Sequence, residues 1–238
     1  MRIQFVQDII DKIRGKKNLK SNNVKYGRMI FSQDGEDAVL YSLITENKGF
    51  NNKGFYIDIG AHHPFRFSNT CIFYNIGWRG VNIDGTPNSM QEFQKYRPND
   101  INIEAVISNK EEDVQYYSFM EPALNCFDKT VAEERIAKGC ELKETINLKT
   151  KNINDILDTY VPIGQTIDFI NIDIEGVDYD VICSLNYEKY APKYFIIEEL
   201  DYVNKDFVDY QNSRMYQFLS DKGYKVLGKT MRSVIYGK

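Results

Sequence analysis

The stretch Gly54-Phe55-Tyr56-Ile57-Asp58-Ile59-Gly60-Ala61-His62-His63-Pro64 decides the fold, because an apolar strand pattern ends there in an acid and a glycine turn. A strand buried in a parallel sheet is a nearly continuous apolar run. A glycine at its carboxyl end lets backbone approach a ligand where the sheet opens a crevice. A second strand pattern, residues 80–84, ends in Asp84, about where an acid holds ribose hydroxyls in such folds. The sequence therefore predicts a cleft for a nucleotide-type cofactor.

The glycine content of this loop bears on which cofactor binds. A dinucleotide loop carries Gly-x-Gly-x-x-Gly, which brings a helix N-terminus to the pyrophosphate. Here only Gly60 is present, so the loop has no binding position for a pyrophosphate. This argues against the first alternative, an NAD(P)-dependent oxidoreductase. Asp58-Ile59-Gly60-Ala61 instead resembles motif I of class I S-adenosylmethionine-dependent methyltransferases. Their cofactor carries an amino acid and a ribose but no phosphate.

Further segments make the resemblance more specific. Residues 68–70, 77–84, 97–102, 104–108 and 173–176 follow the loop in the order seen in FkbM-family methyltransferases, and the similarity covers roughly residues 31–200. The resemblance implies methyl transfer to oxygen, often a hydroxyl of a sugar or of a glycosylated or polyketide product. It also implies that the cofactor S-adenosyl-L-methionine contacts Asp58, Gly60, Ala61, His62, Ser68, Asn69, Thr70, Asp84 and Ala105.

The loop departs from the family in two places. His62 and Pro64 stand where many relatives carry an Asn and a second Gly, so loop contacts do not transfer directly. We assign His62 to positioning of the cofactor or substrate. His63 is a candidate general base, because an imidazole exchanges protons near neutral pH.

Carboxylates at the ends of two later strands are the main catalytic candidates. Asp173 ends the strand pattern of residues 167–173, Glu175 follows it, and Glu198 ends the next strand pattern, residues 194–197. In one mechanism Asp173, Glu175 or His63 removes the proton of the acceptor hydroxyl. In the other, Asp173 and Glu198 bind Mg²⁺ or Mn²⁺, which lowers the hydroxyl pKa. We prefer the metal-free mechanism, and Glu175 is equally explained as a helix cap.

The whole chain, residues 1–238, is interpreted as a single methyltransferase domain, since no Pro/Gly/Ser-rich linker divides it. Alternating strands and helices predict an α/β, doubly wound, Rossmann-like sheet, in which residues 101–107 form one strand. An antiparallel C-terminal strand pair fits the class I methyltransferase sheet that the resemblance implies. Residues 1–50 form an N-terminal helical extension, and residues 113–150 form an insertion. Within it, residues 121–143 are the candidate lid or acceptor-binding segment, with a simple cover for the sheet as the alternative.

Composition limits the partners. The net charge of −4 provides no basic field, so nucleic acid is not expected as a substrate. No membrane span or signal peptide is recognisable, which predicts a cytoplasmic protein. An apolar face within residues 3–13 predicts a basic amphipathic helix that packs on the domain or on a second subunit of a homo-oligomer, with a membrane surface or a partner enzyme as the alternative.

The leading hypothesis is thus an S-adenosylmethionine-dependent O-methyltransferase whose acceptor is a hydroxyl of a sugar, a nucleotide-sugar, or a glycan or secondary-metabolite precursor. A second alternative is a catalytically inactive methyltransferase-fold binding subunit. The presence of Asp58, Gly60, Asp84 and Asp173 argues against it.

Overall fold

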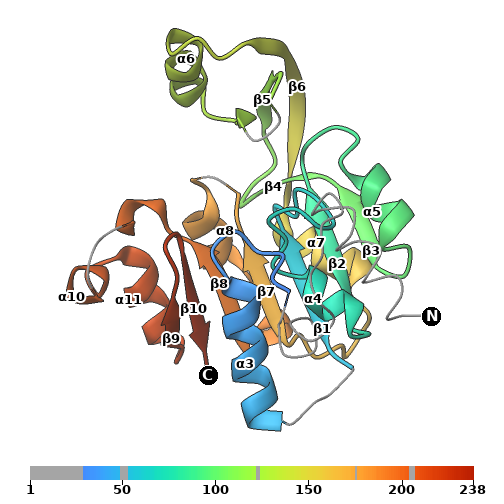
Figure 1. Cartoon of the computed structure of the whole chain (residues 1–238), viewed down its shortest axis with the longest axis vertical. Coiled ribbons are helices and arrows are strands. Elements are labelled where there is room, and N and C mark those ends of the chain that lie inside the picture. Colours follow the sequence, from blue (N-terminus) through green and yellow to red (C-terminus); the bar gives the residue numbers. More distant parts are fainter. Residues whose placement is uncertain (1–28, 49–52, 122–123, 175, 204–206) are drawn as a thin grey trace, which may run out of the picture. The chain divides into compact units, whose positions relative to one another are not determined.

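The computed structural model describes residues 29–48, 53–121, 124–174, 176–203 and 207–238. Residues 31–238 form a compact unit built on a seven-stranded sheet in the order β3-β2-β1-β7-β8-β10-β9 (Figure 1). The strands are β1 (Phe55–Ile59), β2 (Arg79–Asp84), β3 (Ile101–Glu104), β7 (Phe169–Ile172), β8 (Tyr194–Glu198), β9 (Lys225–Lys229) and β10 (Ser233–Gly237).

Strand directions confirm the predicted fold class. The first five strands in this order run parallel to their neighbours. Strand β10 is antiparallel to both β8 and β9, between which it lies. This is a doubly wound class I methyltransferase sheet with an antiparallel C-terminal pair.

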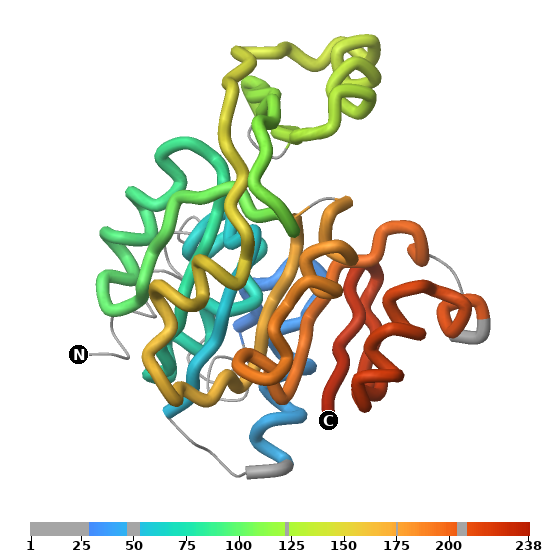
Figure 2. Tube along the Cα trace, turned by 180° about the vertical axis from the view of Figure 1, so that it is seen from behind, coloured from blue at the N-terminus to red at the C-terminus, as the bar shows by residue number. Residues whose placement is uncertain are grey.

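Helices cover both faces of the sheet, which Figures 1 and 2 show from opposite sides. Alternate side chains of β1 explain this arrangement, because successive residues of a strand point to opposite faces. Ile57 packs with α7 (Ile153–Tyr160), α8 (Asp178–Ser184) and α11 (Arg214–Asp221). Tyr56 packs in the cluster that contains residues of α3 (Glu36–Lys48) and α4 (Cys71–Asn75). Further helices of the described residues are α5 (Met90–Tyr96), α9 (Tyr187–Tyr190), α10 (Phe207–Tyr210) and the 3-10 helix η2 (Leu200–Tyr202).

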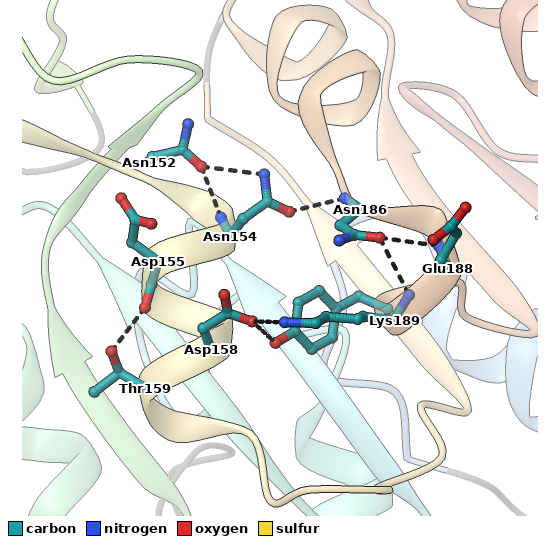
Figure 3. Close-up of polar contacts among 9 residues, drawn as sticks. Asn152, Asn154, Asp155, Asp158, Thr159, Asn186, Glu188 and Lys189 are labelled. Atoms are coloured by element: carbon teal, nitrogen blue, oxygen red, sulfur yellow. Dashed lines mark hydrogen bonds and ion pairs between the residues drawn. The ribbon is translucent and has the colours of Figure 1, made fainter.

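Polar side chains fasten α7 to the segment that follows α8 (Figure 3). Asn152 caps α7 by accepting from the backbone N–H of Asn154 at 2.9 Å. The Asn154 side chain in turn accepts from the backbone N–H of Asn186 at 2.8 Å, and Asp158 accepts from Lys189 at 2.9 Å. These contacts hold α7 against α9, and both helices cover the same face of the sheet.

A second, three-stranded sheet has the order β4-β6-β5. It consists of β4 (Val106–Ser108), β5 (Asp113–Phe119) and β6 (Leu142–Asn152), and α6 (Lys129–Ala137) follows β5 and precedes β6 in the chain (Figure 1). The sequence pattern predicted one strand over residues 101–107. That prediction was wrong, because the chain leaves the large sheet at Ala105 and β3 and β4 belong to different sheets.

The domain boundaries stay predictions. Of the N-terminal extension, residues 1–28 and 49–52 lie outside the described residues, and α3 occupies 36–48. Elements β5, α6 and β6 fill most of the predicted insertion, 113–150. Over the described part of the chain, no helix combines the length and apolar character needed to cross a bilayer.

Candidate active site

A cavity of about 410 Å³ opens where β1, β2, β7 and β8 end. It brings together many of the residues that the sequence singled out. Those that line it are Asp58, Gly60, Ala61, His62, Asp84, Ala105, Asp173 and Glu198.

Gly60 brings the loop after β1 against the loop after β7. Its φ of +83° is unfavourable for residues with a Cβ, and a Cβ built there would lie 1.7 Å from the backbone oxygen of Asp173. The backbone N–H groups of Gly60 and Ala61 both donate to Ile83, at 2.9 and 3.0 Å. Only glycine can therefore occupy this position without moving one of the two loops.

The carboxylate of Asp84 is fixed by backbone amides. One oxygen accepts from the backbone N–H of His62 at 2.8 Å, and the other accepts from that of Thr86 at 2.7 Å. A carboxylate oxygen has two acceptor positions, so each oxygen can still bind a hydroxyl. Asp84 is thus a rigid acceptor pair suited to a ribose diol. Ala105 donates its backbone N–H to the carbonyl of Asp84 at 2.9 Å, which fixes the next part of the cavity wall.

His62 lines the cavity in a strained conformation, with a φ of 52°. Its ring stacks on Phe67 at a centroid distance of 6.4 Å. Burial lowers the pKa of His62, and the nearby Asp84 carboxylate opposes that shift only in part. The imidazole is therefore neutral at neutral pH, which fits the positioning role predicted for it.

The backbone strain at His62 leads to a stability prediction. A residue with a Cβ adopts a positive φ at a cost of about 1–2 kcal/mol, which Asn offsets because its side-chain amide can hydrogen-bond to the local backbone, whereas Ala cannot. His62→Ala should therefore have a free energy of unfolding about 1 kcal/mol below that of His62→Asn, as measured by urea denaturation. Equal stability of the two variants would show that the loop relaxes to a negative φ.

The predicted general base His63 does not line the cavity. Its Nδ1 atom accepts from the backbone N–H groups of Phe65 and Arg66, both at 3.0 Å, so the imidazole organises the turn after Pro64. With Nδ1 occupied as an acceptor, the proton of the neutral ring sits on Nε2, which then has no lone pair for a substrate. This geometry does not bring His63 together with Asp173.

Asp58 lines the cavity and belongs to a buried polar network. Its oxygens accept from Thr70 at 2.6 Å and from the amide of Asn171 at 2.8 Å. The amide of Asn69 donates to Asn171 at 2.8 Å. Burial raises the pKa of Asp58, and its hydrogen bonds to Thr70 and Asn171 oppose that shift. Asn171 also lines the cavity and was missed, although it precedes Asp173 by two residues in a strand pattern and so shares its face.

Arg97 completes this network. It is 1% exposed and donates to Thr70 at 2.7 Å, to Ser68 at 2.8 Å, and to the carbonyl of Pro64. Ser68, Asn69 and Thr70, which the resemblance implies as cofactor contacts, do not line the cavity, because their side chains are engaged in this network. Their observed contacts hold the loop that carries the two histidines.

Asp173 and Glu198 both reach the cavity from the ends of neighbouring parallel strands. Glu175 lies outside the described residues. Glu199 does not line the cavity, and its carboxylate accepts from the hydroxyls of Tyr210 and Tyr236, where burial raises its pKa to about 7. Among the residues that the structure describes, no group of three or more His, Cys, Asp or Glu side chains is arranged to hold a metal ion.

Comparison with solved structures gives distant similarities. The precorrin-6y C5,15-methyltransferase of Geobacter metallireducens matches with 12% identity and a TM-score of 0.44, over 89% of this chain and 92% of that one. The Aeropyrum pernix fibrillarin with bound S-adenosyl-L-methionine matches with 12% identity and a TM-score of 0.44, over 90% of this chain and 83% of that one. No curated protein matches the sequence.

The family assignment rests on a family model instead. The model of the methyltransferase FkbM domain matches residues 58–226, from the acid of β1 into β9. The match spans the glycine loop, Asp84 and Asp173. The chain therefore belongs to the FkbM family of S-adenosylmethionine-dependent methyltransferases.

Proposed function

We propose that this methyltransferase acts on oxygen, at a hydroxyl of a sugar, a nucleotide-sugar, or a glycan or secondary-metabolite precursor. The observation that carries the proposal is the pair of carboxylates, Asp173 and Glu198, in the same cavity as Asp84. Transfer to a hydroxyl requires that the acceptor be aligned and that its proton be removed. A carboxylate at the end of β7 can accept that proton, and its neighbour on β8 can bind an adjacent hydroxyl.

The residues that would hold the cofactor fit its chemistry. Asp84 offers acceptors to the ribose diol, and Gly60 permits close approach of the methionyl part. S-adenosylmethionine supplies an electrophilic methyl group when bound. Its sulfonium and ammonium charges match a cavity lined by several carboxylates and by a His62 imidazole whose pKa is lowered. This fit supports the family's cofactor and argues against a nicotinamide dinucleotide.

Asp84 provides a direct test of cofactor binding. Asp84→Ala removes both ribose acceptors, so S-adenosylhomocysteine should bind more weakly by about 1.5–3 kcal/mol, the usual range for hydrogen bonds to a charged group. Isothermal titration calorimetry with wild type and variant measures this loss. Asp113→Ala, in an exposed residue of β5, is a control that should bind like the wild type. Unchanged affinity in Asp84→Ala, or tight NADH binding by the wild type, would refute the assigned role.

The second sheet supports the acceptor assignment. The rings of Tyr116 of β5 and Phe127 are tilted by 48° to one another at a centroid distance of 5.0 Å, and both residues line the cavity together with Asn125. Aromatic faces and amides suit the apolar faces and hydroxyls of a sugar ring. Asn125 and Phe127 belong to the segment 121–143, which we propose as the acceptor-binding segment.

Of the two mechanisms, the proposal takes the metal-free one, in which a carboxylate of this chain removes the proton. Asp173 is the proposed base, and Glu198 is proposed to orient the acceptor.

The position of the transferred methyl group tests the proposal. The protein is incubated with S-adenosylmethionine carrying a ¹³C-labelled methyl group and with a panel of sugars and nucleotide-sugars. The ¹³C chemical shift of the product distinguishes a methyl on oxygen from one on nitrogen, sulfur or carbon. Methylation of a nitrogen or carbon acceptor, with no O-methyl product, would overturn the proposal while leaving the family assignment intact.

A further inference from the structure

We propose that Arg232 forms an anion-binding site for an acidic group of the acceptor, either a carboxylate or a phosphate. The inference rests on the proposed function, because it narrows the acceptor to an acidic sugar or sugar derivative. The charged side chains of the cavity point to this residue. Of the described residues that line it, Arg232 is the sole Lys or Arg, whereas the acids are Asp58, Asp84, Glu112, Asp173 and Glu198.

The location of Arg232 is fixed by the sheet. Its backbone carbonyl accepts from the N–H of Glu199 at 2.8 Å, and the following residue, Ser233, pairs with Glu198. Arg232 therefore stands beside the end of β8, next to one of the two carboxylates of the proposed acceptor site.

A salt bridge to Asp34 orients the guanidinium of Arg232. Its Nη1 atom donates to both oxygens of Asp34, at 2.8 and 2.9 Å. The turn that carries Asp34 is held in place, since Glu36 accepts from the backbone N–H of Asp34 at 3.0 Å and from the hydroxyl of Thr230 at 2.6 Å. Within the described part of the chain these are the side-chain bonds of Arg232, so Nη2 and Nε retain donors. Because the ion pair at Nη1 fixes the orientation of the planar guanidinium, the donors on Nη2 and Nε are pre-organised to bind an anion.

Arg232 could bind one of two anions, the α-carboxylate of the cofactor or an acidic group of the acceptor. The distance from Asp84 decides between them. The α-carboxylate of the cofactor is joined to the ribose by a chain of six bonds, roughly 8 Å when extended at about 3.8 Å for every three bonds. Asp84 ends β2, and Arg232 adjoins β10, four strand positions away in the sheet. At about 4.8 Å per position, that separation is roughly 19 Å. A cofactor whose ribose is held by Asp84 therefore ends near β7, and the region of Arg232 is left to the acceptor.

Other residues that line the cavity suit a sugar acid. Leu200 and Val177 line the same cavity and are 53% and 36% exposed, so they offer apolar surface to the C–H face of a ring. Gln33 also lines the cavity, and its amide is a neutral donor and acceptor that suits hydroxyls. A uronic acid or a sugar phosphate carries this combination of ring, hydroxyls and anion.

Binding to the protein loaded with S-adenosylhomocysteine tests this inference without relying on turnover. The probes are D-glucuronate and D-glucose 1-phosphate, with methyl β-D-glucoside as the neutral counterpart, and their affinities are measured by ligand-observed NMR titration. The wild type should prefer one of the acidic probes to the neutral one. Arg232→Gln should lower the affinity for that acidic probe by about tenfold or more, because a charged hydrogen-bonded pair is lost. Its affinity for S-adenosylhomocysteine should stay unchanged.

Two further variants make the result specific. Arg232→Lys keeps the charge next to Asp34 but lacks the planar fork, so it should also lose most of the preference, and it serves if the glutamine variant fails to fold. Arg214→Gln removes an arginine that lies over the ring of Tyr179, and it should behave like the wild type.

Three outcomes would overturn the inference. The wild type could bind neither acidic probe, or Arg232→Gln could bind the acidic probe as well as the wild type does. In the third, Arg232→Gln loses affinity for S-adenosylhomocysteine instead, which assigns the anion to the cofactor. Failure of the proposed function would differ from all three, because it would appear as a methyl group on nitrogen, sulfur or carbon.

Discussion

Replacing Asp173 with Asn should lower the turnover of methyl transfer by about two to four orders of magnitude, the usual contribution of acid–base catalysis. The substitution keeps the size of a side chain at the end of β7 that lines the cavity but removes its basicity. Turnover is measured with labelled S-adenosylmethionine and the acceptor found in the O-methylation panel. Thermal unfolding and S-adenosylhomocysteine affinity should remain close to those of the wild type.

The matched control is Asp158→Asn. This substitution changes a carboxylate that accepts from Lys189 outside the cavity, and turnover should not change. Turnover should also be indifferent to a chelator. Inhibition by the chelator that Mg²⁺ or Mn²⁺ reverses would restore the metal hypothesis for Asp173 and Glu198. Near wild-type turnover in Asp173→Asn would remove that residue from the mechanism and leave Glu198 as the next candidate base.

Gly60→Ala should abolish cofactor binding and destabilise the fold by roughly 2–5 kcal/mol, the sum of an unfavourable positive φ and of overpacking. The added Cβ would lie 1.7 Å from the backbone oxygen of Asp173, and this atom cannot move without displacing the end of β7. Urea denaturation measures the stability loss, and calorimetry measures the binding of S-adenosylhomocysteine.

Gly139→Ala separates the two contributions. Gly139 has a nearly equal φ of +87° at the end of α6, but no atom lies within 4 Å of the position that its Cβ would take. It should therefore show the conformational cost alone, about 1–2 kcal/mol, with unchanged cofactor affinity. Equal losses in the two variants would mean that the loops after β1 and β7 separate easily.

Local sequence patterns predicted the central strands and the acids that end them. An apolar run long enough for a buried strand locates Asp58, Asp84 and Asp173 with little ambiguity, because parallel strands share one carboxyl edge. The strand over residues 101–107 was harder to predict. The apolar pattern continues through Ala105, and only pairing with β6 shows that the chain has entered a second sheet.

The side chains between these strands could not be assigned from spacing alone. Ser68 and Thr70 resemble ligands in the sequence, but Arg97, which follows nearly thirty residues later, occupies their hydroxyls. Arg232 was not singled out because its relation to Asp34 spans almost the whole chain. Such contacts are set by the topology of the sheet, so neither motif nor periodicity signals them.

The position of β10 inside the sheet has a consequence for folding during synthesis. Strand β8 ends in Glu198, and until residues 233–237 have left the ribosome its outer edge has no partner on the side where β10 pairs. Unpaired strand edges promote association between nascent chains. The hairpin of β5 and β6, by contrast, joins segments close in sequence and can pair early. We therefore expect the carboxylate end of the cavity to form last, with the folding intermediate prone to aggregate through β8.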